Sequence, residues 1–227
     1  MFPTVSSGTQ ATPDPPRQLP RGPHRLAREV IEASQRGRLL DAMAKVVAEK
    51  GYAATTVADV IAKAGVSRRT FYEHFRDKEG CFLAAYDTGV EILLETVRQA
   101  GEGIEDPLER TRARVRAYLE TLAAEPAFAR TFEIEIAAAG PRAQARRRDV
   151  YARFAEQARE DAAAARQQVP GLPEPPEEVY LAAVGATDAV VSARVAEGRI
   201  AELPELEPVV LQIQLALIVG VVPPAAR

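Results

Sequence analysis

The side chains best suited to chemistry lie close together between residues 67 and 74. Arginine can donate two hydrogen bonds to the O6 and N7 atoms of guanine, and threonine can contact the methyl group of thymine. Arg68, Arg69 and Thr70 bring these groups together within one turn of a predicted helix. The N-terminus of such a helix also favours phosphate, because its free N–H groups carry partial positive charge. The segment therefore indicates contact with DNA through residues that face outward: Ser67, Arg68, Arg69, Thr70, Tyr72 and His74.

Two short helices must position these residues. Thr56, followed three residues later by Asp59, has the form of a capping box and predicts a helix from Val57 to Ala64. Gly65 suits a left-handed turn, and Ser67 suits the N-cap of a second helix that ends at Phe75. Two short helices joined by a glycine-containing turn are typical of a helix-turn-helix. Its small core is expected to consist of Val57, Val60, Ile61, Val66, Phe71 and Phe75.

The segment from residue 51 to residue 79 resembles the DNA-binding signature of the tetracycline-repressor (TetR) family of bacterial transcriptional regulators. With the preceding helix, the resemblance covers about residues 34–86. It implies a dimer that binds a double-stranded DNA operator, with a C-terminal helical domain that binds a small molecule and dimerises. The matching residues, in order and without gaps, are Gly51-Tyr52, Thr55-Thr56-Val57, Asp59, Ala64-Gly65-Val66-Ser67, Thr70, Tyr72, His74-Phe75 and Lys78-Glu79.

The resemblance assigns expected roles to the matched positions. Thr56 is expected to bond a backbone phosphate. Arg68, Arg69 and Thr70 lie where the family reads bases. Further contacts with or near phosphates are expected from Ser67, Tyr72, His74 and Lys78.

The sequence departs from the family pattern at two positions. Ile61 stands where a small residue is usual, four positions before Gly65, so the two helices are expected to cross slightly differently. Arg69 stands where glycine is common, which implies an additional base or phosphate contact and leaves the operator sequence open. Glu73 would repel a phosphate and is expected to point away from it.

Composition excludes several other classes of protein. The 227 residues include one cysteine and two histidines, so no disulfide framework or cysteine-based zinc site is expected. No apolar run reaches the roughly 18–20 residues of a membrane span, and no signal peptide is recognisable. Phosphate loops, nucleophile elbows and cofactor fingerprints are absent from the sequence. We therefore expect a cytoplasmic protein that is not an enzyme, uses no cofactor or metal and does not enter a membrane.

Charge and proline content divide the chain into three parts. The net charge is −3, but residues 15–78 are basic and residues 79–227 are acidic, which favours a polyanion-binding first domain. Residues 1–23 contain six prolines and are expected to form a disordered arm. The basic end of the arm is either a solvated tail or a DNA contact. The predicted boundaries are the arm at 1–23, a helix-turn-helix domain at 24–78 and a ligand-binding and dimerisation domain at 79–227.

The remaining pattern predicts an all-α fold with about nine or ten helices, because no useful alternation of a strand occurs. The first domain should have three helices, beginning with one from Leu26 to Lys50 that is interrupted near residues 34–37. The C-terminal helices are expected at about residues 78–100, 107–125, 127–139, 142–168, 176–197 and 207–222.

The last two helices are the expected homodimer interface. The segment Val209–Val219 is apolar on nearly every side, and small residues such as Ala182, Gly185 and Ala189 permit close approach of the helix before it. Two such helices from each chain would form a four-helix interface, whose two-fold symmetry matches an inverted-repeat operator. Ordinary burial within one chain is the alternative.

A binding site for a small-molecule effector of unknown identity is harder to locate from the sequence. Glu133 and Glu135 lie in an apolar stretch but, being two residues apart, do not share a helix face. A buried carboxylate needs a partner, such as Arg114 or a cationic ligand. The aromatic candidates fit an ordinary core equally well, Arg146–Arg148 is expected to be a solvated face, and Cys81 is expected to be a buried thiol. The candidate ligand-binding residues are Tyr118, Phe132, Glu133, Glu135, Tyr151, Phe154 and Asp188.

These features favour a dimeric, sequence-specific transcriptional regulator, expected to be a repressor that a small molecule releases from its operator. Ligand binding would shift the population toward a spacing of recognition helices that no longer matches the operator, with the helix from Lys78 as the lever. The alternatives are a nucleoid-type protein that binds DNA without sequence preference and, last, an enzyme. The sequence leaves the choice between repression and activation open.

Overall fold

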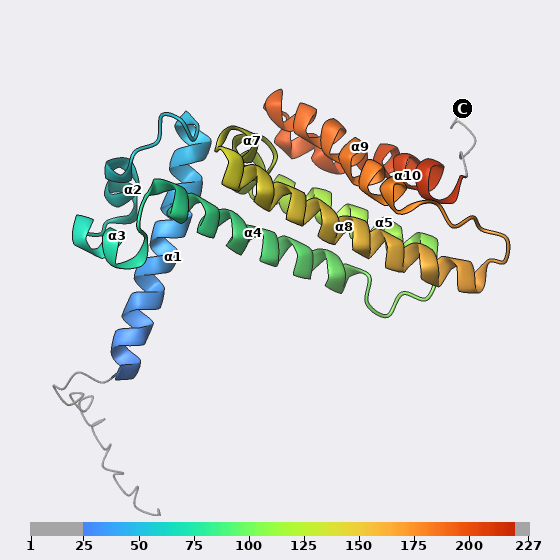
Figure 1. Ribbon diagram of the computed structural model, residues 1–227, viewed down its shortest axis with the longest axis horizontal. Helices are drawn as coiled ribbons and strands as arrows, with labels where there is room; N and C mark the ends of the chain where they lie inside the picture. Colours follow the sequence, from blue (N-terminus) through green and yellow to red (C-terminus); the bar gives the residue numbers. More distant parts are fainter. Residues whose placement is uncertain (1–24, 221–227) are drawn as a thin grey trace, which may run out of the picture.

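The computed structural model describes the backbone of residues 25–220 and the side chains of residues 34–220 (Figure 1). The predicted arm, residues 1–23, lies outside this range. The described residues form helices and no strands, so the predicted all-α fold is confirmed. Helices α1 (Arg25–Lys50), α2 (Val57–Ala64) and α3 (Arg68–His74) gather at one end of the molecule.

The other helices form an elongated bundle beside this N-terminal unit. Helix α4 leaves the unit and packs along α5, α8 packs against α5 and α9, and α9 and α10 cover the opposite side (Figure 1). The elements are α4 (Lys78–Ala100), α5 (Pro107–Ala124), α6 (Pro126–Arg130), the π-helical turn η1 (Thr131–Glu135), α7 (Ile136–Ala138), α8 (Pro141–Gln168), α9 (Glu177–Ala196), the 3₁₀ turn η2 (Ile200–Leu206), α10 (Glu207–Gln214) and the π-helical turn η3 (Leu215–Val219).

Most helix boundaries lie within three residues of the predicted ones, but three segments differ. In one of them, the predicted helix at 207–222 becomes α10 followed by η3, and residues 221 and 222 lie outside the described residues. The expected break near residues 34–37 is wrong, because α1 is continuous. A Cβ atom at Gly37 would meet nothing within 4 Å, and a glycine in such an open helical position costs only about 1 kcal/mol. The predicted helix at 127–139 consists instead of α6, η1 and α7. A π-helical turn changes the direction in which successive side chains point, and such turns are frequent at functional sites.

The predicted caps and turn of the helix-turn-helix are confirmed. The Thr56 side chain accepts a bond from the Asp59 N–H, while the Asp59 carboxylate accepts one from the Thr56 N–H at 2.8 Å. Gly65 has φ of 64°, the left-handed conformation that other residues adopt at a cost. Ser67 caps α3 by accepting from the Thr70 N–H at 3.0 Å. These local bonds fix the angle at which α3 leaves α2.

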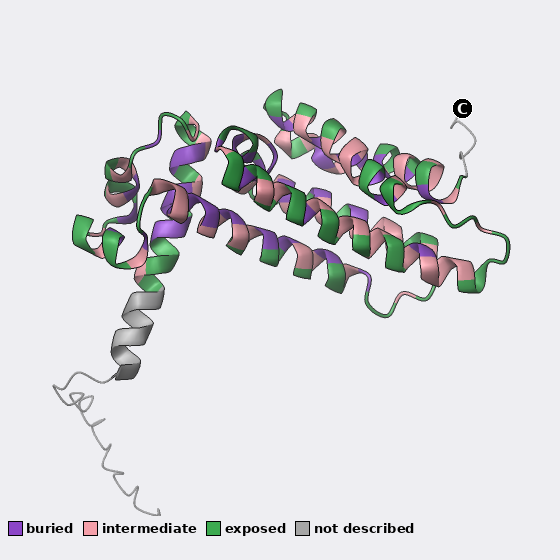
Figure 2. Ribbon diagram, viewed as in Figure 1, coloured by how far each residue is buried: buried purple, intermediate pink, exposed green. Residues whose placement is uncertain are grey.

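A continuous hydrophobic core joins the N-terminal unit to the bundle (Figure 2). Val60, Phe71 and Phe75 of the helix-turn-helix are buried within it, as predicted. The other three predicted core residues are half-buried at its edge: Val57, Ile61 and Val66. On α4, Cys81 is fully buried, and burial raises the pKa of its thiol to about 12, so the expectation of a buried thiol is confirmed. Because one core serves both parts, a movement in the bundle reaches α1 and α4 directly.

Helix α9 is the one described helix long and apolar enough to cross a membrane by length and composition. The sequence expectation that no such segment exists is therefore wrong for this helix. Its alanines and valines give it this character, yet it packs against α8, α10 and η1 within the bundle. Only 28% of its most apolar window is buried, and its exposed apolar residues include Leu181. The helix consequently presents an apolar face that the described residues do not cover.

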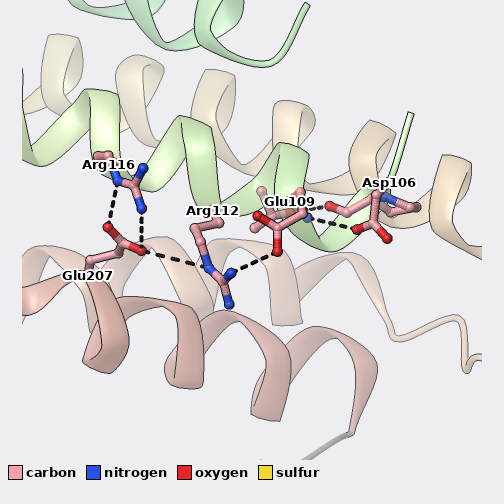
Figure 3. A network of polar contacts seen from close by, with 7 residues as sticks. Asp106, Glu109, Arg112, Arg116 and Glu207 are labelled. Carbon is pink, nitrogen blue, oxygen red and sulfur yellow. Dashed lines mark hydrogen bonds and ion pairs between the residues drawn. The ribbon is translucent and has the colours of Figure 1, made fainter. Parts of the chain in front are cut away.

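A chain of polar contacts attaches α10 to α5 (Figure 3). Asp106 caps α5 by accepting from the Glu109 N–H at 2.9 Å, and Glu109 pairs with Arg112 at 2.7 Å. Arg116 donates two hydrogen bonds to the Glu207 carboxylate, at 2.8 and 3.2 Å. Glu207 lies in the first turn of α10, so these bonds set where α10 begins against α5.

The substitution Glu207→Gln tests this attachment. The Arg116 guanidinium holds the pKa of Glu207 below its ordinary value. Its stabilising effect is therefore present above the unfolded-state pKa of about 4.3 and is lost as the pH falls through the folded-state pKa. We expect the variant to lose about 0.5 kcal/mol of unfolding free energy at pH 7 and less at pH 3, as measured by urea denaturation.

The matched control is Glu205→Gln, because Glu205 is 70% exposed and lies 3.9 Å from Arg194. This control should change the unfolding free energy little at either pH. A loss in Glu207→Gln that is the same at pH 7 and pH 3 would show that charge is not responsible.

Candidate nucleic-acid interface and internal cavity

Helix α3 presents the predicted base-reading residues at the surface. The Arg69 side chain is 88% exposed, Arg68 is exposed and Thr70 is half-buried. Tyr72 is also exposed, and the Arg68 guanidinium lies 5.8 Å from the centre of its ring. The buried ring of Phe71 anchors the helix beneath them. The side chains suited to base contacts therefore stand on a helix whose other face is fixed in the core.

Glu73 is exposed and bonds a residue of the same helix. Its expected direction away from a phosphate stays a prediction. Its carboxylate accepts a hydrogen bond from Arg69 Nε at 2.9 Å, one helical turn away. Opposite charges four residues apart on an exposed helix attract weakly, by about 0.3–0.5 kcal/mol. A base or phosphate that binds Arg69 must displace this bond. Glu73 thereby orients the arginine at small cost to binding.

The hydroxyl groups expected to contact phosphate already serve as helix caps. Thr56 Oγ1 donates to Asp59 Oδ2 at 2.6 Å, and the hydroxyls of Ser67 and Thr70 lie 2.9 Å apart. Lys50 bonds the same aspartate, and this bond, with those from Thr56, lowers the pKa of Asp59 to about 2. The caps place these residues at the start of α2 and α3, where free N–H groups favour anions.

Lys78 is tied to the loop before α2. Its Nζ atom donates to the Tyr52 carbonyl at 2.9 Å and lies 4.2 Å from the centre of the Tyr52 ring. His74 is half-buried beside Phe75, with the ring centres 6.3 Å apart. The sequence analysis matched Tyr52 but gave it no role. Tyr52 directly follows Gly51, whose positive φ ends α1, and this position could have identified Tyr52 as a structurally important residue.

The bundle contains a largely apolar cavity of about 90 Å³ that opens to solvent. Its walls come from α4, α5, η1, α8, α9 and α10, with side chains such as Val97, Val115, Val184 and Val210. The structure brings five of the seven candidate ligand-binding residues to this wall: Tyr118, Phe132, Tyr151, Phe154 and Asp188.

Glu133 lies next to the cavity wall and belongs to a buried polar network. Its Oε1 atom accepts from the Tyr118 hydroxyl at 2.7 Å, while Oε2 has no hydrogen-bond partner. Arg147 donates to both oxygens of Asp188 at 2.7 Å. Arg147 is 22% exposed, so the expectation that Arg146–Arg148 is simply a solvated face is wrong for this residue. The network gives one part of the cavity hydrogen-bonding capacity within apolar walls.

Burial has the largest effect on the pKa values of the two residues Glu133 and Tyr118 in this network. It raises the pKa of Glu133 to about 8, and the neighbouring negative charge of Asp188 acts in the same direction. The pKa of Tyr118 is raised by burial and by the charge of Glu133. At neutral pH, Glu133 is therefore mainly a neutral carboxylic acid.

A second polar cluster lies along the same cavity. Arg114 pairs with Asp161, and Arg110 Nε lies 3.4 Å from the same carboxylate. Arg114 is thus not the partner of Glu133, contrary to the sequence suggestion. Two arginines share one acid, and the Nε atoms of both arginines have no hydrogen-bond acceptor. This cluster carries one excess positive charge beside the cavity.

Glu135 is not at the cavity, although it was a candidate ligand-binding residue. It points to the other side of η1, where Oε2 accepts a hydrogen bond from the Tyr52 N–H at 2.8 Å. The prediction that Glu133 and Glu135 face different ways is confirmed. Both side chains are buried. Among the described residues, no group of three or more His, Cys, Asp or Glu side chains is arranged to hold a metal ion.

Comparison with known proteins supports the interpretation of the N-terminal unit. Residues 39–85 match the model of a family described as bacterial regulatory proteins, tetR family. The transcriptional activator FasR of Mycolicibacterium smegmatis is 34% identical over 101 residues, 44% of this chain and 46% of that protein. The transcriptional repressor KstR2 of Mycobacterium tuberculosis is 33% identical over 89 residues, 39% of this chain and 44% of that protein. The matched region thus spans less than half the length of these relatives.

Solved structures resemble about four fifths of the chain. The fatty acid degradation regulator FadR from Bacillus halodurans has a TM-score of 0.73 and 21% identity, covering 80% of this chain and 94% of that one. FadR from Bacillus subtilis, in complex with stearoyl-CoA, has a TM-score of 0.71 and 18% identity, covering 81% and 98%. At these identities, the likeness shows a shared fold.

The substitution Glu133→Gln tests the neutral state of the buried acid. A raised folded-state pKa means that the folded protein holds a proton that the unfolded chain releases above pH about 4.3. Wild-type unfolding free energy should therefore fall, relative to the variant, as the pH rises from 5 through about 8. We expect the relative loss to exceed about 1.4 kcal/mol, the equivalent of one pKa unit, in urea denaturation at pH 5 and 8.5.

The exposed Glu120 on the same bundle provides the control, as Glu120→Gln. Its stability profile should run parallel to that of the wild type over this pH range. If the Glu133→Gln profile also runs parallel, Glu133 is ionised in the folded protein.

Proposed function

We propose that this chain is a member of the TetR family of bacterial regulatory proteins and that it is a dimeric, sequence-specific DNA-binding regulator of transcription. It acts as a repressor that leaves its operator when a small molecule occupies the bundle cavity. The division into a DNA-binding domain at residues 24–78 and a ligand-binding and dimerisation domain at residues 79–227 is part of this proposal. A regulator of this kind works in the cytoplasm, where the DNA is.

The exposed first turn of α3 carries the proposal. Arg68, Arg69 and Thr70 project from a helix that Phe71 fixes in the core, and a helix of this width fits the major groove. Base contacts from these residues supply specificity. Contacts with the DNA backbone, which set position and register, come from Thr56, Ser67, Tyr72, His74 and Lys78.

The uncovered faces of α9 and α10 support the homodimer. Leu181 on α9 is 47% exposed, Val209 on α10 is 43% exposed and Leu217 on η3 is 42% exposed. Large apolar side chains grouped on adjacent helices mark association surfaces. Pairing these helices with a second copy forms a two-fold interface, which presents two α3 helices to an inverted repeat.

The character of the cavity supports an effector with an apolar part and a polar or anionic group. Its walls are apolar, the Arg110–Arg114–Asp161 cluster offers excess positive charge, and Glu133 is mainly neutral. FadR of Bacillus subtilis, which shares the fold, holds stearoyl-CoA. We therefore include fatty-acyl compounds in the proposal as the first effector class to test.

Selection of random duplex DNA by the purified protein at about 150 mM salt tests the function. Enrichment of an inverted repeat with half-sites about one helical turn apart is expected of a sequence-reading dimer. Addition of stearoyl-CoA should then release the selected DNA, while free coenzyme A should not. Recovery of DNA without a shared motif would instead identify a non-specific DNA-binding protein, whose affinity falls steeply with salt.

The substitution Arg69→Ala should weaken operator binding by about 1–3 kcal/mol and relax selectivity at one base pair. The reason is the loss of a highly exposed base-reading side chain on α3. Fluorescence anisotropy with the selected operator and with single-base variants measures both effects.

Arg159→Ala is the matched control for Arg69→Ala. Arg159 is also an exposed helical arginine paired with a nearby glutamate, Glu156, but it lies on α8. Its removal changes the net charge equally and should leave operator affinity nearly unchanged. Equal affinity and selectivity of Arg69→Ala and the wild type would refute the base-reading role.

Leu181→Glu tests the homodimer. A charge on the uncovered face of α9 should raise the dimer dissociation constant at least tenfold, because the carboxylate would lose water on association. Analytical ultracentrifugation measures the change, and operator affinity should fall with it. Ile92→Glu is the control, since Ile92 is 61% exposed but lies on α4. A similar dissociation constant for both variants would place the interface elsewhere.

A further inference from the structure

The turn η1 holds two buried acidic side chains, which contact two different parts of the protein. Glu133 and Glu135 both belong to η1 and are 2% and 8% exposed. Residues two apart on a helical turn point in widely different directions. Glu133 meets the cavity network, and Glu135 meets the chain between α1 and α2. The proposed function uses only the first of these contacts.

The part of η1 that borders the cavity would contact a bound ligand directly. Phe132 of η1 lines the cavity, and so does Tyr118, which donates to Glu133. Glu133 Oε2 is buried without a hydrogen-bond partner, so a ligand or a shifted side chain that forms a hydrogen bond with it would improve its bonding. Occupancy of the cavity therefore acts on η1 from two successive residues.

The other end of the turn is held firmly to the N-terminal unit. Glu135 Oε2 accepts from the Tyr52 N–H at 2.8 Å, and a bond from a charged acceptor is stronger than a neutral one. Gly51 packs against the same carboxylate, since a Cβ atom there would lie 3.5 Å from Oε2. Arg130 Nε approaches the other oxygen at 3.6 Å. Displacing η1 thus either moves Gly51 and Tyr52 or breaks a buried bond.

Tyr52 in turn holds a residue of the proposed DNA interface. Its carbonyl accepts from Lys78 Nζ, and its ring lies beneath the same ammonium group. Thr55, a buried residue of the same loop, bonds the Gly51 carbonyl at 2.8 Å and precedes the cap of α2. The loop from Gly51 to Thr56 therefore links η1 to Lys78 on one side and to α2 on the other.

We propose that Glu135 is a positioning residue that transmits occupancy of the cavity, through its bond to the Tyr52 N–H, to the DNA-binding surface. The inference rests on the proposed function for its biological meaning. The mechanical link itself lies within one chain and is tested without DNA. A second path exists, because Phe132 stacks on Tyr86 of α4 at 5.6 Å between ring centres, and the experiment separates the two.

The experiment compares the full-length wild type with Glu135→Ala and Glu135→Gln. The glutamine oxygen still accepts from the Tyr52 N–H, whereas alanine cannot. The cavity is filled in two ways: with stearoyl-CoA, and by Val184→Phe or Ala158→Leu, which enlarge side chains of the cavity wall. The readouts are amide hydrogen exchange at Tyr52, stearoyl-CoA affinity, and the ratio of operator affinities with the cavity empty and filled.

Filling the cavity of the wild type should change Tyr52 exchange and operator affinity at least fivefold. In Glu135→Ala, Tyr52 exchange should become fast and indifferent to the cavity, and the operator ratio should approach one. Ligand affinity should remain measurable in that variant, because Glu135 does not line the cavity. Glu135→Gln should keep most of the response.

Val60→Ala controls for general weakening of the N-terminal unit, since Val60 is buried in α2 and does not contact η1 through a hydrogen bond. The proposal would be overturned if Val60→Ala abolished the response to the cavity as fully as Glu135→Ala does. It would also be overturned if the operator ratio of Glu135→Ala equalled that of the wild type, which would assign the coupling to the Phe132–Tyr86 path. Tyr52 exchange that ignores the cavity in the wild type would also overturn it. If exchange responds but no operator is bound, the proposed function fails while the link stands.

Discussion

A carboxylate buried in an apolar bundle must find a partner or give up its charge, and this constraint organises the structure around η1. Glu133 responds to it by taking a hydrogen bond from Tyr118 and a raised pKa. Glu135 responds by accepting a backbone N–H from the N-terminal unit. The two solutions require nearly opposite directions from residues two apart, which any helical turn supplies. The same turn, η1, consequently contacts both the cavity network and the loop that precedes the helix-turn-helix.

The polar groups of the interface follow a related principle, because they are ordered before any DNA is present. Thr56 and Ser67 cap their helices, Glu73 holds Arg69, and Lys78 rests on Tyr52. Exposed ion pairs are weak, so exchanging them for contacts with nucleic acid costs little. Ordering them in advance reduces the side-chain entropy lost on binding. The same side chains thus stabilise the isolated helices and remain available to a partner.

Local sequence patterns predicted the N-terminal unit well, but they did not predict which residues far apart in the sequence form pairs. Caps and turns depend on residues within four positions, so the neighbouring sequence was enough to predict the roles of Thr56, Gly65 and Ser67. The partners of Glu135 and Arg147 lie 83 and 41 residues away, and no spacing rule reaches that far. The aromatic candidates occupied helical core positions, but only the assembled bundle shows which of them border a cavity. The π-helical geometry of η1 was also invisible, because periodicity does not distinguish one extra residue in a turn from an ordinary helix.

The η1 turn contributes Phe132 to the cavity wall, but most of the wall comes from other parts of the chain. Val184, Ala158 and Val210 shape the cavity from α9, α8 and α10 without contributing to the bonds of Glu135. Under the proposed function, substitutions at these three residues would change the ligand preference of the bundle and leave the bond between Glu135 and Tyr52 in place. New ligand specificities could then arise stepwise, and a designed biosensor could vary the same three helices while the turn stays unchanged.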